Sequence, residues 1–143
     1  MGLVQAMIPP RLRYAFAHTR YRVRAPAGSF DLRIARRSAA LAQWPRALNP
    51  LGNVLVTAWN PNGRRRSLAI NRAAERRLQQ RLRAWHLCGW PTLARDPKGL
   101  WPDEPGMLIF GVTQALALEL GRALGQRAVV FVAGDAVPRL LWL

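Results

Sequence analysis

The feature that most constrains the fold is the order of apolar patterns from residue 54 onward. Short apolar runs occupy 54–59, 92–95, 107–112 and 128–132, and two amphipathic helical patterns lie among them, over 67–85 and 114–124. Ser67 and Thr113 are the expected N-caps of these helices, and Gly125 is the expected end of the second. The order is therefore strand, helix, strand, strand, helix, strand. Two βαβ units in this order are typical of a sheet whose helices cover one face. We predict an α+β fold, a ferredoxin-like two-layer sandwich with a mixed β-sheet.

The N-terminal part adds a predicted hairpin to this sandwich. Residues 21–24 and 30–34 alternate apolar and polar side chains as half-buried strands do, and the residues between them suit a turn. A short helix is expected within 36–48 and an edge strand over 139–143. Because the length matches one hydrophobic core and no linker divides it, we expect one domain over 1–143, with residues 1–12 poorly ordered.

Composition argues against several classes of protein. No apolar run approaches the roughly 20 residues that cross a bilayer, so no transmembrane span is expected. The single cysteine, Cys88, cannot form an internal disulfide, which favours the cytoplasm, and we predict that it is buried. His18 and His86 lack metal-ligand spacing, and dinucleotide, Walker and nucleophile-elbow motifs are missing from the sequence. We therefore expect no metal and no cofactor.

Positive charge is concentrated in the first part of the chain. The formal net charge is +15; residues 1–83 contain 17 arginines and two acids, whereas residues 84–143 contain five basic and five acidic residues. Such a surface attracts phosphate backbones, acidic proteins or anionic lipid heads. Only one basic residue is lysine, which indicates a GC-rich genome. A solvated basic surface without a partner is therefore the alternative interpretation.

Two groups of residues are candidates for a functional site. The first group would bind an anion at the start of the long helix and along its exposed face: Arg64, Arg65, Arg66, Arg72, Arg76 and Arg83. The second would surround a pocket where a strand ends and loop donors point outward: Thr57, Asn60, Asn71, Trp101, Glu104 and Gln126. Structural roles are the alternative for both groups. Asn60 would cap a turn, Asn71 would tie the loop to the helix, and Glu104 would pair with nearby arginines.

Some of these residues belong to motifs that are similar to those of a known family. The motifs are Thr57-Ala58-Trp59-Asn60-Pro61, Ser67 with Asn71, Trp101-Pro102 with Glu104, Gly125-Gln126 followed by Ala128-Val129-Val130, and Tyr14, Thr19 and Tyr21 near the N-terminus. In this order the sequence resembles the bacterial family known as domain of unknown function 3293, over most of the chain. That family has no established activity, so the resemblance bears on the fold and implies no function.

Three functional hypotheses are compatible with these patterns. The first is a non-catalytic module that binds nucleic acid or another polyanion through residues 64–66 and the helix face over 72–83, which requires a contiguous basic surface. The second is a small enzyme acting on a phosphorylated or carboxylated metabolite, with Thr57, Asn60, Asn71 and Glu104 around its pocket. The third is a domain that docks an acidic protein partner. Catalysis and oligomeric state are left open by the sequence.

Overall fold

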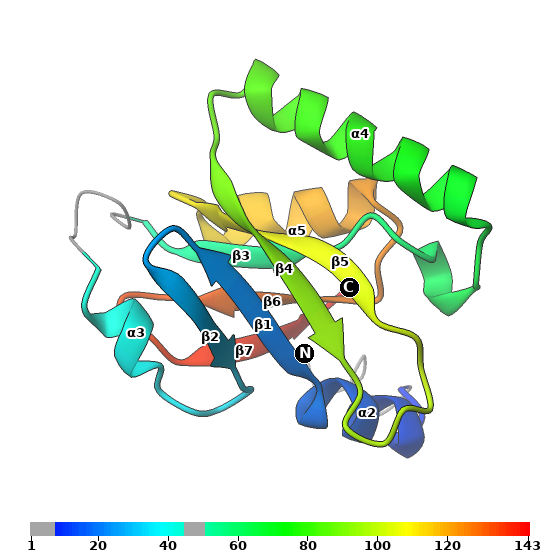
Figure 1. The fold of residues 1–143 in the computed structure, drawn as a ribbon, viewed down its shortest axis with the longest axis horizontal. Helices are drawn as coiled ribbons and strands as arrows, with labels where there is room; N and C mark the ends of the chain where they lie inside the picture. The colour runs from blue at the N-terminus through cyan, green and yellow to red at the C-terminus, as the bar shows by residue number, and fades with distance from the viewer. Residues whose placement is uncertain (1–7, 45–50) are drawn as a thin grey trace.

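The computed structural model describes residues 8–44 and 51–143, and its central feature is one curled sheet (Figure 1). Its strands are β1 (Arg20–Ala25), β2 (Gly28–Leu32), β3 (Asn53–Val56), β4 (Gly89–Arg95), β5 (Glu104–Phe110), β6 (Ala128–Val132) and β7 (Pro138–Trp142). The helices in these residues are α2 (Pro10–His18), α3 (Ala39–Ala42), α4 (Leu68–Ala84) and α5 (Gln114–Ala123), with a 3-10 turn, η2 (Pro61–Gly63). None of these helices is long and apolar enough to cross a membrane.

The sheet is antiparallel throughout, so the predicted mixed sheet is wrong. Its strand order is β2-β1-β4-β5-β3-β6-β7, and each neighbouring pair is antiparallel. Strands β3 and β4, which helix α4 joins, do run in the same direction, but β5 lies between them. Apolar periodicity shows where strands lie and not which of them pair, and the prediction failed for that reason.

The predicted ferredoxin-like two-layer sandwich is also wrong, because elements cover both faces of the sheet. On the convex face, α4 and α5 pack Leu78, Leu82, Ala117 and Leu120 against the sheet. The concave face encloses a second cluster in which residues of β1 and β2 meet residues of β6 and β7, and α3 adds its own apolar side chain. The sheet thus curls around this inner cluster (Figure 1).

Two backbone hydrogen bonds hold the ends of the curled sheet together. The Ala35 N–H donates to the carbonyl oxygen of Pro138 at 2.9 Å, and the Ser38 N–H donates to that of Ala136 at 2.8 Å. These bonds join the segment after β2 to the start of β7, at the opposite edge of the sheet. The core of the concave face is therefore enclosed on both sides by the chain itself.

Local signals placed the hairpin and the two long helices correctly. Strands β1 and β2 pair as the predicted hairpin, with Tyr21 opposite Leu32. Ser67 and Thr113 each accept a hydrogen bond from a backbone N–H three residues ahead, at 3.2 Å, so both predicted N-caps are confirmed. Gly125 follows α5 with a φ of 66°, which confirms the predicted stop.

Other local predictions failed or lie partly outside the described residues. Helix α2 was not predicted, because the two usual sequence signals of a helix, an apolar stripe and a capping side chain, are weak here. The helix buries no residue, and Pro9 at its N-cap makes no side-chain hydrogen bond. Of the helix expected within 36–48, the described residues contain α3, and 45–48 lie outside them. Cys88 is exposed in the turn before β4, so its predicted burial is wrong.

Close strand packing makes Gly89 a test of the sheet. A Cβ at this position would collide with the carbonyl oxygen of Leu108 on β5, which is backbone and cannot rotate away. We expect Gly89→Ala to lower the free energy of unfolding by about 1–3 kcal/mol, the usual cost of overpacking. Gly134→Ala is the control, because open space surrounds that glycine. Urea denaturation compares the two variants, and equal stabilities would contradict the close approach of β4 and β5.

Candidate ligand-binding pocket

A cavity of about 230 Å³ lies between the concave face of the sheet and helix α2. Three small residues on separate strands line it: Ala94 on β4, Gly106 on β5 and Ala128 on β6. Their neighbours further along the same face, such as Leu108 and Val130, are large and fill the inner cluster. The cavity therefore exists because small side chains occupy one end of the concave face.

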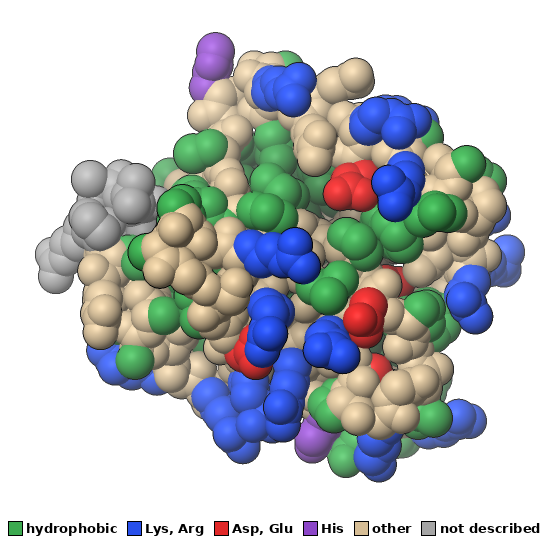
Figure 2. Space-filling model, viewed as in Figure 1, with side chains coloured by type: hydrophobic (Ala, Val, Ile, Leu, Met, Phe, Trp, Pro, Cys, Tyr) green, Lys and Arg blue, Asp and Glu red, His purple; other side chains and the backbone are tan. Residues whose placement is uncertain are grey.

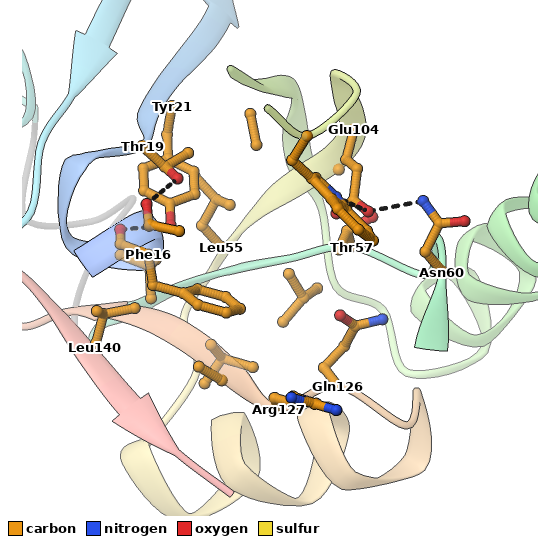
Figure 3. Close-up of a pocket in the computed structure, with 18 of the residues that line it drawn as sticks. Phe16, Thr19, Tyr21, Leu55, Thr57, Asn60, Glu104, Gln126, Arg127 and Leu140 are labelled. Carbon is orange, nitrogen blue, oxygen red and sulfur yellow. Dashed lines mark hydrogen bonds between the residues drawn. The ribbon is translucent and has the colours of Figure 1, made fainter. Parts of the chain in front are cut away.

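The inner wall of the cavity is apolar. Phe16 from α2, Leu55 from β3 and Leu140 from β7 line it (Figure 3). Small-molecule sites in proteins are typically concave and mostly apolar, with a few polar groups that orient the ligand. This part of the cavity suits the apolar body of a small organic molecule.

Polar residues gather at the rim, at one end of the sheet. Because the pairs are antiparallel, β3 ends where β5 and β6 begin. Side chains from these three places and from the loop before β5 therefore converge. Of the six residues predicted to surround a pocket, five line the cavity: Thr57, Asn60, Trp101, Glu104 and Gln126. The sixth, Asn71, supports the rim from α4.

Asn60 holds the rim together. Its backbone is left-handed, with a φ of 48°, a conformation that asparagine tolerates better than most residues. The side-chain Nδ2 donates to Glu104 Oε1 at 2.8 Å, and Oδ1 accepts from Asn71 Nδ2 at 3.0 Å and from the Arg66 N–H at 2.8 Å. The Asn60 N–H in turn donates to Asn71 Oδ1 at 3.0 Å. One buried asparagine thus links β3, α4 and β5.

Glu104 presents a carboxylate to the cavity. Its Oε1 accepts from Asn60 Nδ2 and, at 2.9 Å, from Trp101 Nε1, which fixes the orientation of the group. Within the described residues, Oε2 has no hydrogen-bond partner and no cation forms an ion pair with Glu104. Trp101, whose indole makes the second of these bonds, is 37% exposed. The second carboxylate oxygen is therefore available to a ligand.

Arg127 lines the cavity on the other side of its mouth. In Figure 3, Glu104 and Arg127 lie on opposite sides of the space that the sticks surround. The guanidinium lies beside Gly63: a Cβ on that glycine would be 3.6 Å from the Cζ of Arg127. No ion pair in the described part of the chain involves Arg127. Gln126 Nε2 donates to the Trp59 carbonyl oxygen at 3.1 Å and so anchors this turn to the loop after β3.

Two further polar side chains line the cavity deeper in the sheet. Thr92 is 5% exposed, and its Oγ1 has no hydrogen-bond partner among the described residues. Burial raises the pKa of the Tyr21 phenol above its ordinary value, and the charge of Glu104 raises it further, whereas a hydrogen bond with Thr19 lowers it. The net shift is upward, so the phenol stays neutral. Neither Thr92 nor Arg127 was predicted as a site residue. Thr92 is a single polar residue in a strand, and Arg127 lies in residues 84–143, where basic and acidic residues are equal in number, so neither stands out in the sequence.

The arginines predicted to bind an anion lie apart from this cavity. All six are exposed, three in the loop before α4 and three on α4 itself, and none of them lines the cavity. The ion pairs in the described residues are Arg22–Asp31, Arg95–Asp103 and Arg139–Asp135, so none of the six is neutralised by an acid. Figure 2 shows basic side chains in several separate groups on the face in view, with apolar surface and acids between them.

The asparagine pair gives a stability test of the rim. Asn71 is 3% exposed, and its removal would leave the Asn60 N–H without its acceptor in a buried setting. We expect Asn71→Ala to lower the free energy of unfolding by about 1–3 kcal/mol, the cost of leaving a buried polar group unpaired. Gln80→Ala, at an exposed position of the same helix, is the control. Urea denaturation measures both, and a similar small effect in the two variants would show that the rim does not depend on this pair.

Comparison with known proteins relates the chain to a family. The model of a family described as protein of unknown function (DUF3293) matches residues 56–129, slightly more than half of the chain. The matched segment runs from the end of β3 into β6, and it contains all six predicted pocket residues. The resemblance seen in the sequence motifs is thereby confirmed. No curated protein and no solved structure matches the chain significantly.

Proposed function

We propose that the chain, which belongs to the DUF3293 family of proteins of unknown function, binds a small organic molecule with an apolar body and an acidic head group. One observation carries the proposal: polar residues distant in sequence, such as Thr57 and Gln126, converge on the rim of one largely apolar cavity. An apolar cavity of about 150 Å³ can hold benzene. The cavity of about 230 Å³ therefore has room for a phenyl-sized body and a small polar group.

The acidic head group is inferred from the charges around the rim. Arg127 is a cation at the mouth with no ion pair in the described residues, and guanidinium groups bind carboxylates and phosphates through paired, charge-assisted hydrogen bonds. The net charge of +15 also raises the local concentration of small anions. A carboxylated or phosphorylated metabolite suits this site better than a neutral one.

Arg127→Gln tests this proposal directly. Calorimetric titration compares 3-phenylpropionate with 3-phenylpropanol, a neutral molecule of nearly the same shape. We expect the acid to bind more tightly, and Arg127→Gln to weaken acid binding about tenfold, or about 1.4 kcal/mol, with no effect on the alcohol. Arg122→Gln is the control, because it removes the same charge at an exposed position of α5 that does not line the cavity. If the acid and the alcohol bind equally, or if both variants behave alike, the proposal is wrong.

A second candidate function, polyanion binding, has separate support. The arginines on the exposed face of α4, Arg72, Arg76 and Arg83, are unpaired within the described residues and fall on one side of the helix by their spacing. Regularly spaced guanidinium groups on a helix suit contacts with a phosphate backbone, with little discrimination between bases. This function would use a surface distinct from the cavity.

Salt dependence distinguishes polyanion binding from a solvated basic surface. Binding to mixed RNA and DNA is measured at about 50 mM and about 200 mM salt. Replacing Arg72, Arg76 and Arg83 together by Gln should weaken binding and reduce the salt slope, by roughly one for each arginine that no longer meets a phosphate. The control replaces Arg13, Arg24 and Arg122, which are exposed elsewhere and carry the same total charge. Binding that is insensitive to salt, or equal weakening in both triple variants, would refute this second function.

A further inference from the structure

The mouth of the cavity carries two opposite charges that do not pair with each other. Glu104 begins β5, and Arg127 immediately precedes β6, with β3 between those strands. Strands are about 4.8 Å apart, so the two backbones are roughly 10 Å apart at the rim. Neither side chain forms an ion pair within the described residues. A second acid, Asp96, also lines the cavity, but its two carboxylate oxygens already accept hydrogen bonds from backbone N–H groups of the loop before β5. The rim therefore offers Glu104 and Arg127 to whatever enters.

These two groups lie at the ends of the two strands that flank β3. Both side chains line the same end of the cavity, and hydrogen bonds with Asn60 and Trp101 fix the Glu104 carboxylate in place (Figure 3). A ligand that meets both groups at once needs a compact head with its two charges close together. Glu104 is partly buried and Arg127 is exposed, and such a head would give each of them a charged hydrogen-bond partner.

An independent observation also indicates a polar ligand. Thr92 is 5% exposed, lines the cavity, and its Oγ1 has no partner among the described residues. Buried polar groups in proteins are nearly always hydrogen-bonded, so this hydroxyl lacks a partner that something in the cavity would supply. It stands opposite Gly106 on β5, where a Cβ would lie 2.9 Å from Thr92 Oγ1 and 2.5 Å from the Val56 carbonyl oxygen, so a larger residue would crowd the hydroxyl.

We propose that the ligand is a zwitterion with a compact head group and an apolar side chain, the class to which large hydrophobic α-amino acids belong. Its ammonium group binds Glu104 Oε2, its carboxylate binds Arg127, and its apolar part lies among Phe16, Leu55 and Leu140. Thr92 donates or accepts one further hydrogen bond. This inference rests on the proposed small-molecule site. It adds that the ligand carries a cationic group, which Glu104 binds.

A matched set of four probes tests the inference on the full chain by calorimetry. L-Phenylalanine carries both charges and the ring, 3-phenylpropionate lacks the ammonium, 2-phenylethylamine lacks the carboxylate, and glycine lacks the apolar part. We expect phenylalanine to bind at least about tenfold more tightly than each of the others, since each of those three lacks one charged group or the buried ring.

Glu104→Gln should affect the binding of phenylalanine and of 3-phenylpropionate differently. Glutamine keeps an oxygen that accepts from Asn60 and Trp101, so the rim is preserved while the negative charge is removed. Phenylalanine binding should weaken about tenfold, whereas 3-phenylpropionate binding should hold or strengthen because a repulsive charge is gone. The second probe also shows that the variant is folded.

Thr92→Val should weaken phenylalanine binding without lowering stability, because the hydroxyl it removes has no partner within the described residues.

The outcomes separate this inference from the proposed function. If 3-phenylpropionate binds as tightly as phenylalanine and Glu104→Gln weakens neither, the zwitterion is excluded while a pocket for an acidic molecule stands. If neither acid binds more tightly than 3-phenylpropanol, both proposals fail. Tight phenylalanine binding that depends on Glu104 and Arg127, and not on the control Arg122, supports the inference.

Discussion

The hydrogen bonds of Asn60 hold the candidate site in its arrangement. This single buried side chain and its backbone meet Asn71 on α4, the Arg66 N–H before α4, and Glu104 on β5. Asn60 stands just after β3, in a left-handed conformation that turns the chain sharply. Four segments are therefore held together by polar contacts at the end of the sheet. Buried networks of this kind are specific because each unmet partner would be costly.

The curl of the sheet converts this rim into the mouth of a cavity. Strands β1 and β2 face β6 and β7 across the inner cluster, so the concave face is enclosed. Where large side chains occupy this face it is packed, and where Ala94, Gly106 and Ala128 occupy it a hollow is left under α2. The size of the side chains along this face thus decides where it is packed and where a ligand has room. Because Glu104 and Arg127 lie on either side of β3, the hollow has a mouth with both signs of charge.

Prediction from the sequence was most successful where the signal is local. N-caps at Ser67 and Thr113, the stop at Gly125 and the first hairpin all depend on residues within a few positions of each other. Five residues named from the sequence as pocket candidates line one cavity; Thr57 and Asn60 follow a strand, whereas Trp101, Glu104 and Gln126 lie in or beside the turns that precede other strands. Prediction failed for Cys88, whose exposure depends on the fold around it, and for α2, which buries no residue and has no capping side chain.

The amino-acid sequence alone was enough to predict the order of strands and helices from residue 53 onward, the α+β composition and the uneven distribution of arginine. The three-dimensional fold was needed to show that all strands pair antiparallel, that elements cover both faces, and that Arg127 and Thr92 join the predicted residues around the cavity. The difference arises because hydrophobic periodicity is a property of one segment, whereas strand pairing and cavity lining depend on contacts between segments. Glu104 and Arg127 face each other across a pocket because β3 runs between their strands, and no pattern within either segment encodes that path.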